Sequence, residues 1–285
     1  MDIPRPGELL RRHGLSPRKS WGQNFLHAFH VHEAIVRAAG AGPGTRVVEI
    51  GAGLGTLTMH LLATEAEVWA IERDRDLCHV LRQELADHPR FRLFEADAVR
   101  FDYSTASDGT HPRPAVVGNL PYQLTGALLF ALLDHEPRTG PWIVMVQKEV
   151  ADRMCAGPGS KQYGAASVSL GRVRRISKVI DVGRSCFLPP PRVDSAVIRF
   201  DPLEAPRGEV ADPEAFRKLV RACFQQRRKT LLNSLQSVGS KQEVLAWCEA
   251  ADVDPKLRPE RLSIEQFAAL QRAREAQPAA TPDDA

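Results

Sequence analysis

Residues 47–58 read VVEIGAGLGTLT, a short apolar run followed at once by glycines at positions 51, 53 and 55. An apolar run bounded by glycine indicates a buried strand, and the residues that follow, to about Leu62, predict a helix. Glycine lets the backbone turn tightly and lets a ligand approach closely. The G-x-G-x-G spacing is shorter than the G-x-G-x-x-G dinucleotide fingerprint. By itself it also fits a tight strand-to-helix turn that binds nothing.

The same alternation of strands and helices continues along the chain, and it predicts an α/β, Rossmann-like fold with a parallel sheet and helices on both faces. Two late strands, at 176–182 and 195–200, have no full helix between them and predict an antiparallel hairpin at a sheet edge. We predict the other strands at 47–50, 68–71, 91–94, 115–117 and 142–146, and helices at 31–41, 75–86, 124–134 and 148–154.

Length and local composition predict two domains. A chain of 285 residues has room for one large domain and one small domain. The stretch DPLEAPRGEVADP after Phe200 is rich in proline and charge and predicts a linker near 201–212. We therefore expect a Rossmann-like domain at 1–203 with a basic N-terminal arm at 1–20. A small helical domain at 204–275 and a disordered tail at 276–285 would follow.

Composition excludes several classes of protein. At 43% hydrophobic and 26% charged residues, the chain is typical of globular proteins. No apolar stretch approaches the roughly 20 residues that span a bilayer, and the N-terminus lacks an apolar signal core. The five cysteines are scattered without a C-x-x-C pair, so neither a disulfide framework nor a metal site is indicated. We expect a cytoplasmic monomer without a membrane partner.

Polar side chains follow the predicted strands where each strand ends. Glu72 closes the second strand, and Asp97 and Asn119 close the third and fourth. Because the carboxyl ends of parallel strands meet at one sheet edge, these residues predict a nucleoside pocket there. NAD and S-adenosylmethionine both carry adenosine. The missing pyrophosphate turn and the two acids Glu49 and Glu72 favour the cationic S-adenosylmethionine.

The stretch GNLPYQLT, residues 118–125, resembles the [Asn/Asp]-Pro-Pro-[Tyr/Phe] signature of enzymes that methylate exocyclic amines. Adenine N6 is a poor nucleophile because its lone pair is delocalised into the ring. The side-chain oxygen of Asn119 and the carbonyl of Leu120 can accept its two N–H bonds. Pro121 stiffens the turn, and Tyr122 offers a flat face for an extruded base. A plain turn with a core tyrosine is the alternative interpretation.

The whole chain from about residue 18 to 270 resembles the small-subunit ribosomal RNA adenine dimethyltransferases, the KsgA family. That family uses S-adenosylmethionine and converts two adjacent adenines near the 3′ end of 16S rRNA, in the 30S subunit or its precursor, to N6,N6-dimethyladenine. The resemblance rests on KSWGQNFL (19–26), VEIGAGLGTLT, IERD, GNLPYQLT, MVQKEVADRMCAGPGSKQYGAASV (145–168), FLPPPRVDSAVIRF (187–200) and FQQRRKTLLNSL (224–235).

The resemblance also implies roles for individual residues. Gly51 would border the methionine portion of the cofactor, Glu72 its ribose and Asp97 its adenine amine. Phe187 would be a second aromatic clamp opposite Tyr122. The full set implied at the cofactor is Asn24, Leu26, Gly51, Gly53, Glu72, Asp97, Ala98 and Asn119, and the set implied at the target base is Asn119, Leu120, Pro121, Tyr122 and Phe187.

A basic stretch near the C-terminus predicts contacts with RNA. RKLVRACFQQRRK, residues 217–229, carries six basic groups and no acid. On an RNA-modifying protein such a stretch favours phosphate contacts, although a solvated helix face is the alternative. We predict that the last three basic residues of this stretch lie on a helix. We also predict that RNA is contacted by Lys218, Arg221, Arg227, Arg228 and Lys229.

Other functions remain open from the sequence. The macrolide-resistance enzymes, which methylate one adenine of 23S rRNA, share the QNF and Asn-x-Pro-Tyr elements, but the FQQRRKTLLNSL block favours the small-subunit enzymes. A non-catalytic assembly or transcription factor on the same fold is disfavoured by the intact Glu72, Asp97 and Asn119. An adenine-N6 DNA methyltransferase leaves QNFL and the C-terminal block unexplained.

Overall fold

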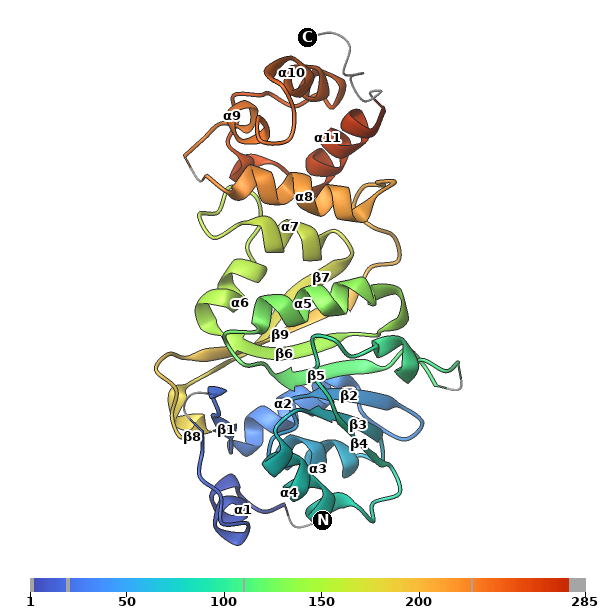
Figure 1. The fold of residues 1–285 in the computed structure, drawn as a ribbon, viewed down its shortest axis with the longest axis vertical. Helices are drawn as coiled ribbons and strands as arrows, with labels where there is room; N and C mark the ends of the chain where they lie inside the picture. Colours follow the sequence, from blue (N-terminus) through green and yellow to red (C-terminus); the bar gives the residue numbers. More distant parts are fainter. Residues whose placement is uncertain (1–2, 19–20, 110, 227, 277–285) are drawn as a thin grey trace. The chain divides into compact units, whose positions relative to one another are not determined.

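The computed structural model describes residues 3–18, 21–109, 111–226 and 228–276. It divides into two compact units, each built from two stretches of chain. The first unit, which we call the sheet unit, comprises Met1–Ala151 and Arg175–Pro202. The second, the helical unit, comprises Asp152–Arg174 and Leu203–Ala285. Figure 1 shows the course of the chain through both units.

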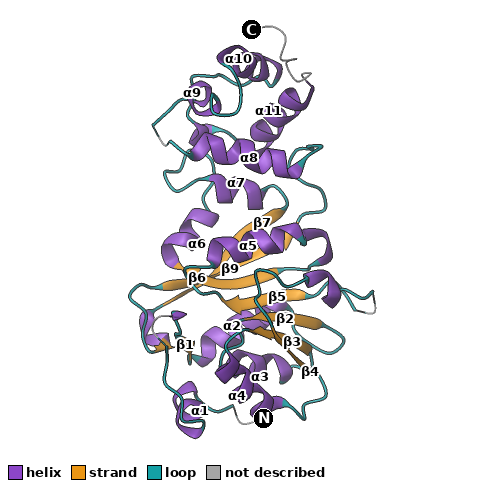
Figure 2. Ribbon diagram, in the orientation of Figure 1, coloured by secondary structure: helices purple, strands orange, loops and turns teal. Residues whose placement is uncertain are grey.

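A seven-stranded mixed sheet forms the centre of the sheet unit, with the order β4-β3-β2-β5-β6-β9-β7 (Figure 2). The first five of these strands run parallel, and β9 pairs antiparallel with β6. The strand order reverses direction between β2 and β5, which is where open sheets of this kind bind ligands. The strands are β2 (Arg46–Ile50), β3 (Glu67–Glu72), β4 (Phe91–Glu95), β5 (Ala115–Asn119), β6 (Trp142–Gln147), β7 (Arg174–Val182) and β9 (Ser195–Pro202).

The central strands are buried on both faces, as their continuous apolar runs predict. Every residue of β2 is buried, and β6 is buried from Trp142 to Val146. The edge strand β7 differs, since most of its side chains are partly or fully exposed. Charged side chains such as Lys178 suit an edge strand because they discourage pairing with another chain. The predicted placement of the two late strands at an edge is confirmed, with β9 between β6 and β7.

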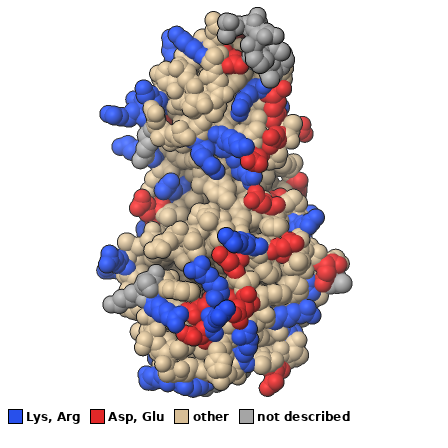
Figure 3. Space-filling model, viewed as in Figure 1, with Lys and Arg blue, Asp and Glu red and all other residues tan. Residues whose placement is uncertain are grey.

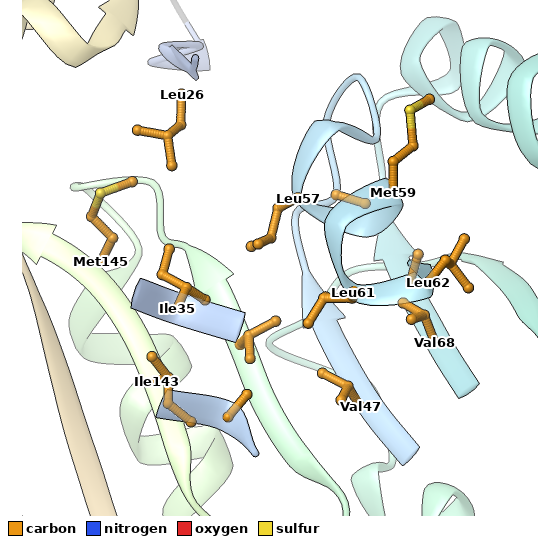
Figure 4. Close-up of a cluster of buried hydrophobic side chains, with 14 of the residues drawn as sticks. Leu26, Ile35, Val47, Leu57, Met59, Leu61, Leu62, Val68, Ile143 and Met145 are labelled. Carbon is orange, nitrogen blue, oxygen red and sulfur yellow. The ribbon is translucent and has the colours of Figure 1, made fainter. Parts of the chain in front are cut away.

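Helices cover the sheet between successive strands. Helices α2 and α3 pack on one face through residues such as Ile35 and Leu61, which meet Val47, Val68 and Ile143 of the sheet (Figure 4). Asp74 caps α4 by accepting the N–H of Asp76. The helices are α2 (Phe29–Ala39), α3 (Thr56–Leu62), α4 (Arg75–Leu85), α5 (Thr125–Asp134) and α6 (Lys148–Met154).

The N-terminal segment is docked on the sheet unit by side-chain contacts. Helix α1 (Pro6–Arg12) buries Leu9 against the α4 residues Leu77 and Val80. Its Arg12 donates two hydrogen bonds to Glu84, at 3.0 and 2.8 Å. At least one arginine of the predicted basic arm therefore forms an ion pair within the chain.

A second, two-stranded sheet joins distant parts of the sheet unit. Strand β1 (Phe25–Leu26) pairs antiparallel with β8 (Phe187–Leu188), and Figure 1 shows the two strands side by side. The sequence did not predict this sheet, because two-residue strands carry no periodicity. This pairing brings the QNFL segment, residues 23–26, next to the FLPPP segment, residues 187–191.

The helical unit has its own hydrophobic core. Phe216 and Leu219 of α8 pack there with Trp247 of α10 and Phe267 of α11. Asp212 caps α8 by accepting the N–H groups of Glu214 and Ala215. The helices are α7 (Ala165–Gly171), α8 (Pro213–Phe224), α9 (Leu231–Leu235), α10 (Lys241–Ala250) and α11 (Ile264–Ala276).

The predicted domain boundary is right at one end and wrong in the middle. The sheet unit ends at Pro202, next to the predicted limit of 203. Residues 152–174, however, belong to the helical unit, where Tyr163 and Val168 enter the core. The predicted first domain, 1–203, included this stretch, and no helix was predicted at α7. Apolar packing of α7 against α8 decides otherwise.

Residues 277–285, most of the predicted tail, lie outside the described residues. No helix of the described residues is long and apolar enough to cross a bilayer.

Candidate active site

A cavity of about 370 Å³ lies in the sheet unit at the carboxyl ends of β2, β3 and β5. It sits at the reversal of strand order, where such sheets bind ligands. All predicted cofactor residues line it, and so do three further residues expected at the target base. The lining includes Asn24, Leu26, Gly51, Gly53, Glu72, Asp97, Ala98, Asn119, Leu120, Pro121 and Tyr122.

The glycine loop closes one wall of the cavity. Gly51, Gly53 and Gly55 all have positive φ angles, of 68°, 61° and 82°, which favour glycine. A Cβ on Gly55 would lie 2.9 Å from the end of the Leu81 side chain, which would have to shift to make room for it. A Cβ on Gly51 would meet nothing within 4 Å. Gly51 therefore leaves open space beside the cavity.

Glu72 holds the backbone around the cavity. Its carboxylate accepts three backbone N–H groups, from Gly53 at 3.0 Å, Arg73 at 2.8 Å and Asp74 at 2.9 Å. Burial raises the pKa of this carboxyl, while the three N–H bonds oppose that rise. A carboxylate has about four lone-pair sites, so one acceptor site remains for a ligand hydroxyl. Glu72 is thus part of the loop framework as well as a candidate ribose contact.

Glu49 lies on the cavity wall and is almost fully buried. The hydroxyl of Thr58 donates to it at 2.6 Å. Burial, opposed by the hydrogen bond from Thr58 and aided by the nearby Glu72, raises the pKa of Glu49 to about 8. Glu49 is therefore mainly neutral at pH 7 in the protein alone, and a cationic ligand in the cavity would favour its ionised form.

We predict that Glu49 makes stability fall as the pH rises. Its pKa is raised on folding, so its stabilising contribution is complete below about pH 4.5 and is lost as the pH rises towards 8. The free energy of unfolding of the wild-type chain should decrease between pH 5 and 8.5 by on the order of 4 kcal/mol more than that of Glu49→Gln. Urea denaturation of both proteins at several pH values measures this difference. Parallel stability curves would contradict it.

The amide of Asn119 is held in one orientation. Its Nδ2 donates to the backbone carbonyl of Asn24 at 3.0 Å. No described residue donates to its Oδ1 in the hydrogen bonds of the structure, so this oxygen remains an acceptor. Leu120 donates its N–H to Met145 of β6 at 3.1 Å. This bond fixes the peptide between Asn119 and Leu120, directly before the peptide that carries the Leu120 carbonyl, the second predicted acceptor.

Gly118, immediately before Asn119, explains how β5 approaches β2 so closely. A Cβ there would lie 2.7 Å from the carbonyl oxygen of Ile50. A larger residue would push Asn119 away from the cavity edge. After the turn, the carbonyl of Pro121 accepts the N–H of Leu124, and α5 begins at Thr125. The motif is thereby held between a strand and a helix.

The far end of the cavity is bordered by an aromatic and charged cluster. The guanidinium carbon of Arg73 lies 4.9 Å from the centroid of the Trp21 ring. The same guanidinium forms an ion pair with the Asp97 carboxylate, with 4.0 Å between nitrogen and oxygen. Gln23 donates to Asp74 at 2.8 Å, and Arg18 forms an ion pair with the same carboxylate at 3.3 Å. These contacts tie the segment before β1 to the loop after β3, and both segments line the cavity.

Phe187 is not brought to the cavity. It is 2% exposed and packs in the core of the sheet unit, opposite Leu26 in the pairing of β1 with β8. Because side chains alternate along a strand, the next residue, Leu188, points outward and is 38% exposed. In this arrangement Phe187 supports the segment that carries Leu26 and offers no free ring face opposite Tyr122.

The predicted RNA-contacting residues that the structure describes lie in the helical unit, but they are not all on one helix. Helix α8 carries Lys218 and Arg221, both exposed, and Lys218 pairs with Glu214 at 2.9 Å. The predicted helix through Lys229 is wrong, because α8 ends at Phe224 and Thr230 caps α9. Arg228 and Lys229 are exposed in the turn between these helices, while Arg227 lies outside the described residues. Figure 3 shows basic side chains gathered beside this turn.

His32 lines the cavity, although no sequence motif singles it out. It is 3% exposed, its Nε2 has no hydrogen-bond partner among the described residues, and its ring lies 4.6 Å from that of His60. Burial and the neighbouring histidines lower its pKa to about 3, so it is neutral. Among the described residues, no group of His, Cys, Asp and Glu is placed to hold a metal ion.

Comparisons with known proteins agree with this geometry. A family model described as ribosomal RNA adenine dimethylase matches residues 14–274. The Ribosomal RNA small subunit methyltransferase A of Anaeromyxobacter sp. (strain K) is 46% identical and covers 94% of this chain and 97% of its own. The protein of the same name from Pseudomonas aeruginosa is 41% identical, with coverages of 89% and 92%.

Solved structures show the same fold. A dimethyladenosine transferase from Plasmodium falciparum has a TM-score of 0.70 at 26% identity, and covers 86% of this chain and 95% of its own. The 23S rRNA methyltransferase ErmE has a TM-score of 0.66 at 26% identity, with coverages of 88% and 100%.

Proposed function

Since the chain belongs to the ribosomal RNA adenine dimethylase family and is an rRNA methyltransferase, we propose that its cavity binds S-adenosylmethionine and that it dimethylates N6 of two adjacent adenines near the 3′ end of 16S rRNA. The observation that carries this proposal is the Asn119 amide, which is oriented by Asn24 and keeps its oxygen as an acceptor at the cavity edge.

The cavity suits S-adenosylmethionine better than a dinucleotide. Two acids, Glu49 and Glu72, line it, and a positively charged sulfonium and ammonium would favour their ionised forms. The buried Nε2 of His32 is one more polar atom that a ligand could pair. When bound, S-adenosylmethionine supplies an electrophilic methyl group. Glu72 and Asp97 would hold the ribose and the adenine amine of this cofactor.

The protein's part in the chemistry is to position the amine. The two N–H bonds of adenine N6 would point to the Asn119 Oδ1 and the Leu120 carbonyl, and these acceptors would help to localise on the nitrogen the lone pair that is otherwise delocalised into the ring. Tyr122 would stack on the extruded base, a contact worth about 1–3 kcal/mol. No strong general base is needed, since positioning carries most of the catalysis.

The direct test is methylation of purified 30S particles that lack N6-methylated adenines. With S-adenosylmethionine, the protein should form N6,N6-dimethyladenine at two adjacent positions near the 3′ end of 16S rRNA, as measured by mass spectrometry. Calorimetry should detect binding of S-adenosylmethionine and none of NAD. In a parallel assay with purified 23S rRNA, methylation of that RNA in place of 16S rRNA would support the alternative suggested by the likeness to ErmE. Tight NAD binding would contradict the assignment of the cavity.

The basic turn between α8 and α9 should contribute to binding the ribosomal particle. Replacing Arg228 and Lys229 with alanine should weaken 30S binding and reduce the slope of log affinity against log salt by up to about 0.9 per lost phosphate contact. Affinity for S-adenosylmethionine should not change, because neither residue lines the cavity. Lys241→Ala is the matched control, since it removes an exposed lysine of the same unit that is not among the predicted contacts. An unchanged salt slope in the double variant would exclude the turn as an RNA contact.

A further inference from the structure

The hydroxyl of Tyr122 has a partner that the sequence did not predict. It lies 2.8 Å from the hydroxyl of Ser195, 73 residues away in the chain. Burial raises the pKa of Tyr122, against the effect of Ser195, so the phenol keeps its proton at neutral pH. The sequence assigned a role only to the flat face of this ring.

Ser195 is well placed to hold another residue. It is fully buried and is the first residue of β9, where it pairs with Gln147 at the end of β6. The backbone carbonyl of the preceding residue, Asp194, accepts a hydrogen bond from the backbone N–H of Lys148 at 2.9 Å. The backbone on both sides of the Ser195 hydroxyl is therefore fixed by the sheet.

The sheet also brings Ser195 to the edge that carries Asn119. The last residue of β5, Asn119, is in register with Met145, and Ser195 is in register with Gln147, two residues further along β6. Thus the acceptor amide and the anchor of the ring are fixed to the same strand. The Tyr122 ring joins them from the turn after β5.

Packing alone does not determine the orientation of this ring. Tyr122 is only partly buried and lines the cavity. A ring that is to stack on a base must leave one face without protein contacts, so it lacks packing on that side. A hydrogen bond at the tip of the ring restricts its rotation without covering either face.

We propose that Ser195 is a positioning residue for methyl transfer, whose buried hydroxyl holds the Tyr122 ring in the orientation that stacks the target adenine. This inference rests on the proposed function. Ser195 touches neither the cofactor nor the base and acts through Tyr122.

The test compares Ser195→Ala, Tyr122→Phe and the double variant with the wild type. Single-turnover methylation of 30S particles should slow by about three- to tenfold in each single variant, the range expected for one neutral hydrogen bond. The double variant should be no slower than the slower single variant, because both changes remove the same bond. Affinity for S-adenosylmethionine should stay within twofold.

A spectroscopic measurement distinguishes positioning from a general loss of structure. With 2-aminopurine at the target position of an RNA substrate, bound Ser195→Ala should fluoresce more than bound wild type, since a poorly held ring stacks less and quenches less. Tyr163→Phe is the matched control. The Tyr163 hydroxyl is buried in the helical unit without a hydrogen-bond partner among the described residues, so its loss should change neither rate nor fluorescence.

Three results would overturn the proposal. These are wild-type rates in Ser195→Ala, rate losses that multiply in the double variant, or a slow Ser195→Ala whose 2-aminopurine signal equals that of the wild type. Failure of the wild-type protein to methylate 30S particles would overturn the proposed function and this inference together. Normal wild-type activity with an unaffected Ser195→Ala would overturn the inference alone.

Discussion

Replacing Asn119 with alanine should slow methyl transfer to 30S particles by about 10²–10³-fold, the usual cost of removing one preorganised hydrogen-bonding group from an active site. The change deletes the Oδ1 acceptor and also the donor to the Asn24 carbonyl. The loss should appear in the single-turnover rate at saturating RNA. Binding of the particle should change little, because the basic turn is in the other unit.

Asn119→Asp separates the two functions of this amide. It keeps an acceptor oxygen but cannot donate to Asn24, so it should be at least about tenfold faster than the alanine variant. If both variants are equally slow, the donor to Asn24 is the part that matters, and the acceptor argument fails.

Replacing Glu72 with alanine should cost both cofactor affinity and stability. Three N–H groups, those of Gly53, Arg73 and Asp74, would lose their acceptor. We expect the free energy of unfolding to fall by about 2–4 kcal/mol, since a single unpaired buried group costs about 1–3 kcal/mol and water can reach part of this loop. S-adenosylmethionine binding should weaken by a further 1–3 kcal/mol or so.

Glu72→Gln is the matched variant, because it retains one acceptor oxygen of similar reach. It should recover part of the stability and less of the cofactor affinity. Urea denaturation and calorimetry measure the two quantities separately. Unchanged stability in Glu72→Ala would show that the three N–H bonds do not support the loop.

Much of the sheet unit could be predicted because its signals are local. Each predicted strand from 47–50 to 142–146 is present and ends within two residues of the predicted limits. Buried parallel strands give continuous apolar runs, and polar residues at their carboxyl ends meet at one edge. For that reason Glu72, Asp97 and Asn119 could be placed in one cavity from the amino-acid sequence alone.

The remainder depends on contacts between distant residues, which leave no local pattern. The pairing of Phe25–Leu26 with Phe187–Leu188 joins short segments across most of the sheet unit and turns Phe187 inward. The Tyr122–Ser195 bond and the position of His32 in the cavity lining also depend on distant residues. In the helical unit, the basic run suggested a continuous helix, but Thr230 starts a new one.

The interleaving of the two units has a consequence for dissecting the protein. A chain shortened to end at Pro202 would still contain all the residues that line the cavity, since they precede that point. Such a truncation would retain residues 152–174 and delete the helices against which they pack. Tyr163 and Val168 would then face water, and the shortened chain would be prone to aggregate. A useful truncation must also replace 152–174 with a short polar connection between β6 and β7.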